Sequence, residues 1–158
     1  MSFARLMTLI FCRLFSFGRG IEFVTRKISD AVAKIHLGKQ EKLVLGNMDA
    51  KKDWGFAGDY VEAMWLMLQQ EVPENYIIAT NEVHSVKDFV EEAFKVVGIE
   101  DWEKYVESNE KFKRPTEVIG LKGDYSKAKS KLKWEPKVKF NQLVKMMVED
   151  DIKLNEVK

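Results

Sequence analysis

The chain has 158 residues, of which 46% are hydrophobic, and its formal net charge is +1. That length suffices for one domain with a hydrophobic core, or for a piece of a larger domain, but not for two independent domains. A nearly neutral chain argues for neither a nucleic-acid nor an acidic partner. The single cysteine, Cys12, excludes an internal disulfide and, beside only two histidines, a Cys/His metal site.

Residues 1–17, MSFARLMTLIFCRLFSF, superficially resemble a signal peptide. Arg13 interrupts the apolar run, no small-residue cleavage site follows, and the run is too short to span a bilayer. We therefore expect a displaced or buried helix here, in a cytoplasmic protein without membrane contact. Membrane anchoring through this segment stays an alternative that rests on composition alone.

The next elements are predicted from hydrophobic spacing. Apolar residues recur every three or four positions from Phe23 to Leu37, which predicts an amphipathic helix. The short apolar run Leu43–Leu45 predicts a strand that enters a turn at Gly46 and Asn47. Residues 50–55 are predicted to form a polar loop around a buried tryptophan.

A second helix is predicted from Asp59 to Gln70. Asp59 and Glu62 have the spacing of a capping box, and an apolar stripe follows at Val61, Met64, Trp65 and Leu68. Because the chain offers few strands, we expect this stripe and the face of Val24, Ile28 and Val32 to be partly exposed.

Further along, Asn75–Thr80 predicts a strand, and Ser85 is expected to cap a helix that ends at Gly98. Three more helices are predicted over residues 101–106, 126–132 and 140–152. The fold class is therefore α/β, rich in helices and with few short strands. Such a pattern is typical of the second half of an α/β enzyme without its first half.

Catalytic motifs are missing from these 158 residues. The sequence has no Gly-x-Gly-x-x-Gly or Gly-x-x-Gly-x-x-Gly turn, no Walker lysine, no Gly-x-Ser-x-Gly elbow and no convincing Ser/His/Asp set. We therefore assign no catalytic residue and no metal ligand.

Two pairs of cations are candidates for an anion site. Arg26 and Lys27 lie on or beside the face of the first predicted helix opposite Val24 and Ile28, where a solvated basic edge is the simpler interpretation. Lys51 and Lys52, followed by Asp53, lie before Trp54 in the predicted loop, where an ordinary surface loop and an anion site are about equally supported.

The third candidate is the stretch KRPTEV, in which Pro115 stiffens the chain between Arg114 and Glu117. A guanidinium can bind a diphosphate through paired hydrogen bonds, and a carboxylate commonly accepts hydrogen bonds from a ribose diol. The pair therefore suits a nucleotide, although a salt bridge within the loop explains it equally well.

Charge is unevenly spread along the chain. Residues 71–110 carry 11 acidic and 3 basic side chains, whereas residues 122–145 carry 8 lysines and 2 acidic side chains. These lysines alternate with apolar residues as on a solvated helix face, and no arginine accompanies them. We expect no nucleic-acid partner.

Taken together, several motifs resemble the C-terminal half of GDP-mannose 4,6-dehydratases, which belong to the extended short-chain dehydrogenase/reductase superfamily. They are GIEFVTRKI, LGNMDAKKDWGFAGDYVEAMWLMLQ, ATNEVHSVKDFVEEAF, RPTEV and GDYSKAKSKLKWEPKVKFNQLVKMMVEDD. The resemblance covers residues 19–151. It divides the chain into a divergent segment, 1–18, and a GDP-sugar-binding part, 19–158.

The resemblance implies conversion of GDP-mannose to GDP-4-dehydro-6-deoxy-mannose on the route to GDP-fucose. NADP, bound by an N-terminal Rossmann half, takes a hydride from the sugar, water is eliminated, and the hydride returns. It also implies a homo-oligomer. The C-terminal half holds the GDP.

The resemblance assigns the nucleotide contacts to seven substrate-binding positions: Val24, Lys27, Gly46, Asn47, Lys52, Arg114 and Glu117. Arg19 matches an arginine that contacts NADP. Lys52 replaces a usual arginine, and Phe56 a usual histidine. A lysine is a point charge rather than a fork, which weakens bidentate contact with phosphate.

The family's catalytic Tyr-x-x-x-Lys and glycine-rich loop belong to its N-terminal half, so we expect the isolated chain to be inactive. The alternative is a non-catalytic remnant or interaction module that binds GDP-sugar or pairs with an N-terminal half or a full-length dehydratase. We also expect a truncation or frame disruption near Gly18. Upstream DNA that encodes neither motif in any frame would contradict it.

Overall fold

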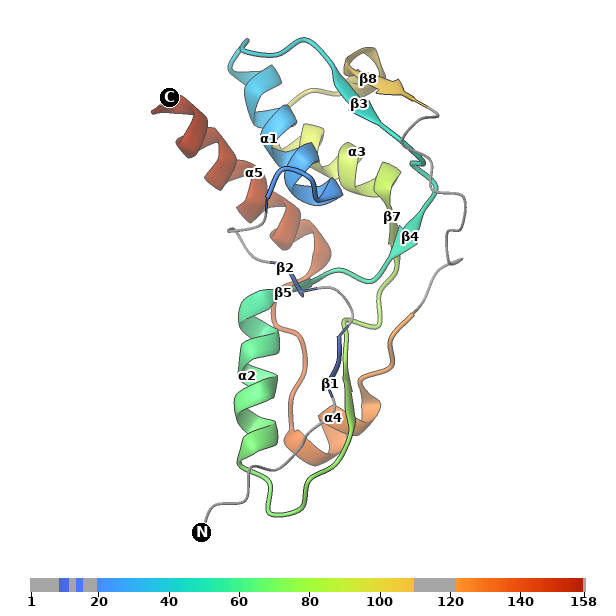
Figure 1. Ribbon diagram of the computed structural model, residues 1–158. Coiled ribbons are helices and arrows are strands. Elements are labelled where there is room, and N and C mark those ends of the chain that lie inside the picture. Colours follow the sequence, from blue (N-terminus) through green and yellow to red (C-terminus); the bar gives the residue numbers. More distant parts are fainter. Residues whose placement is uncertain (1–8, 12–13, 16–19, 110–121, 158) are drawn as a thin grey trace.

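The computed structural model describes residues 9–11, 14–15, 20–109 and 122–157. The predicted site residues Arg19, Arg114 and Glu117 lie outside these ranges. Two hydrophobic clusters organise the described residues, a large one around three helices and a smaller one around one helix and one strand. In Figure 1 the larger cluster occupies the upper part of the molecule and the smaller one the lower part.

The larger cluster is built from α1 (Val24–His36), α3 (Val86–Val96) and α5 (Phe140–Glu156), which contact one another. Ile28 and Val32 of α1 are fully buried there. The prediction that this face of α1 would lack a partner was therefore wrong, because α3 and α5 cover it. The helix prediction itself is confirmed.

The smaller cluster joins α2 (Ala57–Leu68), β6 (Tyr76–Ile78) and α4 (Ser126–Leu132). Its centre is Trp134, which is 2% exposed and lies edge-on to the ring of Tyr60. The indole Nε1 of Trp134 donates a hydrogen bond to the main-chain oxygen of Asp59. The predicted strand near residue 76 and the helix over 126–132 are both confirmed.

The strands are two or three residues long and pair in twos. Three pairs are parallel: β1 (Leu9–Phe11) with β6, β2 (Leu14–Phe15) with β5 (Gly55–Phe56), and β3 (Leu43–Leu45) with β8 (Val106–Ser108). One pair is antiparallel, β4 (Lys51–Lys52) with β7 (His84–Ser85). A helix-rich α/β fold with short strands is therefore confirmed.

Several short elements differ from the prediction. Residues 9–11 and 14–15 form strands rather than a buried helix, because each pairs with a distant strand. The predicted loop over 50–55 contains β4, and residues 101–106 form a 3-10 helix (Trp102–Tyr105) that leads into β8. None of the helices in the described ranges is long and apolar enough to cross a membrane.

The start of α3 follows the sequence prediction closely. The Ser85 hydroxyl accepts a hydrogen bond from the backbone N–H of Asp88, and the Asp88 carboxylate accepts one from the Ser85 N–H. This reciprocal pair is a capping box. Gly98 ends the helix with φ of 75°, a conformation that favours glycine.

The start of α2 does not follow the prediction. The helix begins at Ala57 and has no side-chain cap, so Asp59 and Glu62 form no capping box. The Asp59 carboxylate instead accepts hydrogen bonds from the N–H groups of Lys137 and Val138, at 2.9 and 3.0 Å. Asp59 therefore fixes the chain that leads into α5.

We expect Asp59→Ala to lower the free energy of unfolding by about 1–3 kcal/mol, because the partly buried N–H groups of Lys137 and Val138 lose their acceptor. Urea denaturation measures the change. Glu62→Ala is the matched control, since it removes only a partly exposed ion pair with Lys137 and should cost less than about 1 kcal/mol. Equal losses in the two variants would contradict the assigned role of Asp59.

Candidate functional site

Four of the predicted site residues lie at one end of the larger cluster. Val24 and Lys27 are in the first turn of α1, and Gly46 and Asn47 directly follow β3. α1 contacts β3, and the two run in opposite directions in Figure 1, so the start of α1 and the end of β3 point the same way. The structure therefore brings these two predicted groups to the same end of the larger cluster.

The turn after β3 is held by hydrogen bonds from two sides. The Asn47 side-chain oxygen accepts a hydrogen bond from the Asp49 N–H at 3.0 Å. The N–H of Lys87, in the first turn of α3, donates to the Met48 carbonyl at 2.9 Å. The Ser108 hydroxyl lies 3.5 Å from the Gly46 carbonyl oxygen. These hydrogen bonds hold the predicted turn in one conformation.

Lys52 is placed by the short antiparallel pair. In β4, Lys51 is opposite Ser85 and Lys52 is opposite His84. Lys51 is exposed and Lys52 is half-buried. A half-buried lysine on a paired strand is better suited to a defined anion contact than a lysine in the predicted loop.

Both ends of the segment that carries Arg114 and Glu117 are tied to this region, although the two residues themselves are not described. The segment covers residues 110–121. Before it, the N–H of Asn109 donates to the carbonyl of Leu45 at 2.8 Å. After it, the N–H of Gly123 lies 3.4 Å from the Asp53 carboxylate. The chain therefore leaves beside the β3 turn and returns beside β4.

Asp53 is a site-building residue that the sequence did not single out for this role. The residue is 4% exposed, and its carboxylate accepts hydrogen bonds from the Thr80 N–H and hydroxyl, at 3.0 and 2.7 Å, besides its contact with Gly123. It joins the strand that carries Lys52, the end of β6 and the end of the 110–121 segment. In the sequence, the only sign of this role is that Asp53 directly precedes Trp54, which was expected to be buried.

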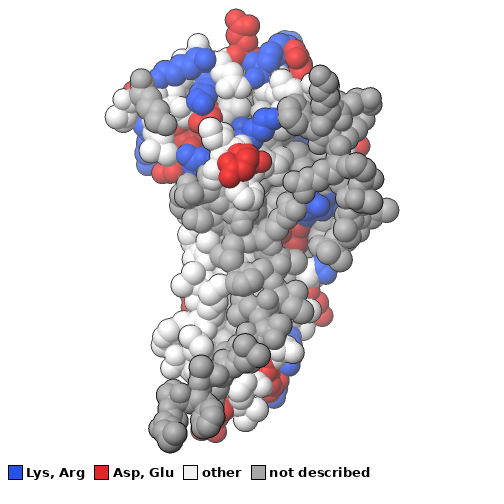
Figure 2. Space-filling model, viewed as in Figure 1, with Lys and Arg blue, Asp and Glu red and all other residues white. Residues whose placement is uncertain are grey.

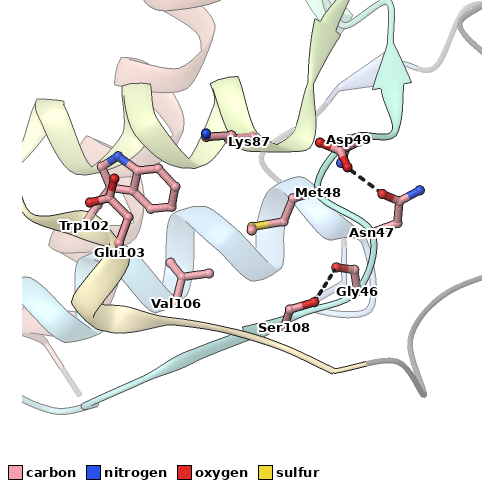
Figure 3. Close-up of a pocket in the computed structure, with 9 residues that line it drawn as sticks. All are labelled: Gly46, Asn47, Met48, Asp49, Lys87, Trp102, Glu103, Val106 and Ser108. Atoms are coloured by element: carbon pink, nitrogen blue, oxygen red, sulfur yellow. Dashed lines mark hydrogen bonds between the residues drawn. The ribbon is translucent and has the colours of Figure 1, made fainter.

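A cavity of about 460 Å³ lies against the turn after β3. Figure 3 shows Gly46, Asn47 and Asp49 on one side of it and Trp102 and Glu103 on the other. Its full lining is Gly46, Asn47, Met48, Asp49, Lys87, Trp102, Glu103, Val106 and Ser108. The cavity takes in two predicted residues, Gly46 and Asn47, but not Val24, Lys27 or Lys52.

Lys87 and Trp102 are cavity residues that the sequence analysis missed. The Lys87 ammonium lies 5.8 Å from the centroid of the Trp102 ring, within the range of a cation–π contact. They reach the turn through the β4–β7 and β3–β8 pairings, which join segments far apart in the sequence. The residues around Lys87 and Trp102 show no sequence pattern that predicts these strand pairings.

Arg26 is not part of a solvated basic edge, so that interpretation was wrong for this residue. Its side chain is 14% exposed, and its guanidinium lies 2.5 Å from the buried carboxylate of Asp151. Burial raises the pKa of Asp151, against the opposing effects of the hydrogen bond from Ser29 and the charge of Arg26. This contact attaches the first turns of α1 to α5 and so fixes the position of Lys27.

The arrangement is suited to an anion. The first turn of α1 contains no acidic residue, and its N-terminal residue, Phe23, provides no side-chain cap. Helix N-termini attract negative charge, and Lys27 and Lys52 add cationic groups. Among the described residues, no group of three His, Cys, Asp or Glu side chains lies close enough to hold a metal ion. The site can therefore position a phosphate-bearing ligand.

The fold is shared with proteins whose structures were solved with NADPH or NAD. RMD from Pseudomonas aeruginosa, solved with NADPH, superimposes with a TM-score of 0.79 over 89% of this chain and 46% of its own, at 16% identity. The dTDP-glucose 4,6-dehydratase of Bacillus anthracis, solved with NAD, has a TM-score of 0.74 over 92% of this chain and 43% of its own, at 22% identity. The chain thus has part of a Rossmann-type fold, the class of fold that these solved proteins share.

Sequence comparison narrows the class. The sequence model of the GDP-mannose 4,6 dehydratase family matches residues 4–147. GDP-mannose 4,6 dehydratase 1 of Arabidopsis thaliana is 58% identical over 136 residues, and the Homo sapiens GDP-mannose 4,6 dehydratase is 51% identical over 152 residues. The chain belongs to the GDP-mannose 4,6-dehydratase family.

The matches span most of this chain but a minor part of each relative. They cover 86% of the chain against 37% of the Arabidopsis thaliana protein and 41% of the Homo sapiens protein. The chain therefore spans about two fifths of the length of these relatives. The family match also includes most of residues 1–18, which the sequence analysis set apart as divergent.

Proposed function

We propose that this chain is the GDP-mannose-binding part of a GDP-mannose 4,6-dehydratase, a carbon–oxygen lyase of the cytoplasm. The observation that supports it most is the convergence of the start of α1, the turn after β3, and both ends of the 110–121 segment. Family membership supplies the substrate class. The division into residues 1–18 and a GDP-sugar-binding part, 19–158, belongs to the same proposal.

The proposed roles follow the chemistry of the side chains. Lys27, Lys52 and Arg114 neutralise the diphosphate, since cations and a guanidinium fork suit its charge and shape. Glu117 accepts hydrogen bonds from the guanosine ribose. Val24, Gly46 and Asn47 form the wall against which the nucleoside lies.

NADP is the proposed cofactor of the complete enzyme, where it would supply hydride transfer. Arg19 is the residue of this chain proposed to contact it. The 158 residues contain no glycine-rich strand-to-helix turn, so they do not fit a complete dinucleotide site. Their one Tyr-x-x-x-Lys match is Tyr125 and Lys129, of which Tyr125 packs against Trp134 and Lys129 pairs with Glu135. We therefore propose that the isolated chain holds substrate without converting it, and that the complete enzyme is a homo-oligomer.

Titration calorimetry with GDP-mannose, GDP and UDP-glucose tests the proposal. We expect GDP-mannose and GDP to bind, and UDP-glucose to bind more weakly. An absence of GDP-mannose binding at millimolar ligand would contradict substrate binding. In a separate assay with NADP, the isolated chain should consume no GDP-mannose, and turnover would contradict the proposed division of roles.

A second candidate function is favoured by one observation, the exposed apolar side of α2. Val61, Trp65 and Leu68 are 57%, 60% and 67% exposed. Such a stripe is typical of a surface that contacts another protein segment. The chain would then act as a non-catalytic interaction module that pairs with an N-terminal half or a full-length dehydratase.

A further inference from the structure

The contact between α1 and α5 contains a carboxylate, that of Asp151, in a residue that is 0% exposed. Its Oδ2 accepts a hydrogen bond from the Ser29 hydroxyl at 2.6 Å, and its Oδ1 lies 2.5 Å from a guanidinium nitrogen of Arg26. Among the described residues, Oδ1 accepts no hydrogen bond, so the charge of Arg26 is what holds it. Both carboxylate oxygens of Asp151 therefore contact the N-terminal half of α1.

A second polar contact lies one turn further along both helices. The Asn155 side-chain amide donates to the Asp30 carboxylate at 3.0 Å, and the Lys34 ammonium group donates to the same carboxylate at 2.6 Å. Residues 26 and 30 of α1 thus face residues 151 and 155 of α5, so the two helices run in the same direction at one register. A rotation or slip of α1 against α5 would break both contacts.

The Arg26–Asp151 contact differs from the ion pairs on the surface. Figure 2 shows charged side chains of both signs on the upper part of the molecule, and exposed ion pairs contribute little to stability. The Arg26 side chain, in contrast, is 14% exposed, and that of Asp151 is fully buried. Burying two charges costs about as much as their attraction returns, so such a pair is better evidence for a fixed geometry than for stability.

This geometry concerns the part of α1 that belongs to the proposed substrate site. Lys27 follows Arg26 directly, and successive residues of an α-helix point about 100° apart around its axis. Because Arg26 is directed at α5, the direction of Lys27 is set as well. The backbone is helical at this point, since the Lys27 N–H donates to the Phe23 carbonyl at 2.9 Å. A rotation of this turn would therefore move Lys27 away from the ligand.

A second carboxylate lies close to Arg26. One of its guanidinium nitrogens is 3.9 Å from the carboxylate of Asp150, whose side chain is 39% exposed. Asp150 and Asp151 are neighbours on α5, so their side chains point about 100° apart. If Asp151 lost its charge, Asp150 would attract Arg26 in a different direction. The orientation of the first turn of α1 therefore depends on the charge of Asp151.

We propose that Asp151 is a positioning residue of the proposed substrate site: its negative charge, acting through Arg26, holds Lys27 in the orientation that binds the diphosphate of GDP-mannose. The proposal rests on the proposed function, and deepens it by naming a residue that controls the affinity from outside the site. Asp151 is fully buried between the helices, so it does not contact the ligand itself.

The charge of Asp151 depends on pH. Burial raises its pKa above the usual value of an aspartate, against the hydrogen bond from Ser29 and the charge of Arg26, which lower it. Asp30 on α1 and Asp150 on α5 raise the pKa further, and the buried residues of α3, which contacts both helices, are all apolar. Since the ionised form holds Arg26, the affinity for GDP-mannose should fall as the pH is lowered through this pKa.

Titration calorimetry with GDP-mannose at neutral pH tests the role. Asp151→Asn keeps the size of the side chain but removes its charge, and we expect the affinity to fall about fivefold or more, the lower end of typical couplings between separate sites. Asp150→Asn is the matched control, because it removes the neighbouring, partly exposed charge, and it should leave the affinity unchanged. Arg26→Gln should match the loss of Asp151→Asn. The double variant should lose no more than either single variant, because the two residues act as one unit.

A pH series separates positioning from a loss of structure. In the unchanged chain, the affinity should fall on acidification from neutral pH towards about pH 4, where aspartates titrate. The diphosphate of GDP-mannose is esterified at both ends and keeps its charge over this range. Asp151→Asn should remove the fall, whereas a contribution from His84 would persist in the variant. Without ligand, the amide chemical shifts of residues 24–27 should show the same titration in the unchanged chain and lose it in Asp151→Asn.

The remaining outcomes overturn the proposal. These are an affinity that Asp151→Asn leaves unchanged, a pH dependence that is as large in this variant, losses that add in the double variant, and an equal loss in Asp150→Asn. Circular dichroism checks that each variant is folded, and the double variant, which buries no unpaired charge, replaces Asp151→Asn if that variant does not fold. An unchanged chain that binds no GDP-mannose would contradict the proposed function too, whereas binding that Asp151→Asn does not weaken would reject the positioning role alone.

Discussion

Trp54→Ala should lower the free energy of unfolding by about 3–5 kcal/mol, the usual cost of removing a large aromatic side chain from a core. Trp54 is 2% exposed. Its ring lies edge-on to Phe89 at 5.3 Å between centroids and stacks on Phe140 at 5.9 Å. These contacts join the segment after β4 to α3 and α5, so the variant loses the centre of the larger cluster. Urea denaturation followed by circular dichroism measures the loss.

Trp65→Ala is the matched control, since it removes the same side chain from a position that is 60% exposed. We expect it to change the free energy of unfolding by less than about 1 kcal/mol. A similar loss in both variants would contradict the assignment of Trp54 to the core and Trp65 to the surface. Because Trp54 follows Lys52 and Asp53, its loss should also weaken ligand binding.

Arg114→Ala should weaken GDP-mannose binding by about 10- to 100-fold, the effect of losing a charge-assisted hydrogen-bonding pair worth about 1.5–3 kcal/mol. The expectation depends on the motif and on the position of the 110–121 segment. The two ends of that segment lie beside the β3 turn and beside Asp53. Titration calorimetry of the variant against the unchanged chain gives the ratio of dissociation constants.

Two further variants separate a specific role of Arg114 from a general effect of charge. Lys95→Ala removes a cation whose side chain is 73% exposed on α3, and it should leave the affinity unchanged. Arg114→Lys keeps the charge but not the fork, so its affinity should lie between those of Arg114→Ala and the unchanged chain. Equal weakening by Lys95→Ala would indicate a general charge effect and would contradict a specific role for Arg114.

The sequence predicted the elements whose signals are local. The helix of residues 24–36 follows from apolar spacing, and the start of α3 follows from the Ser85 cap. The start of α2 was misjudged because Asp59 accepts hydrogen bonds from Lys137 and Val138, far along the chain. The strands near the N-terminus were missed for the same reason, since each depends on a distant partner.

The candidate site could be predicted only in part. The family motifs supplied Lys27, Gly46, Asn47 and Lys52, which lie in the first turn of α1, directly after β3 and in β4. Their common role in binding stays a prediction. The structure also adds Asp53, whose role depends on hydrogen bonds to Thr80 and Gly123. Such roles become visible only when distant segments are brought together.

Amide chemical shifts during a GDP-mannose titration test the account most directly, because they show both whether the ligand binds and where. The account predicts the largest shift changes at Gly46, Asn47, Lys52 and in residues 110–121, with the amides of the last turns of α5 unaffected. Shift changes confined to other surfaces, or none at millimolar GDP-mannose, would contradict the proposal that this part of the chain holds the substrate.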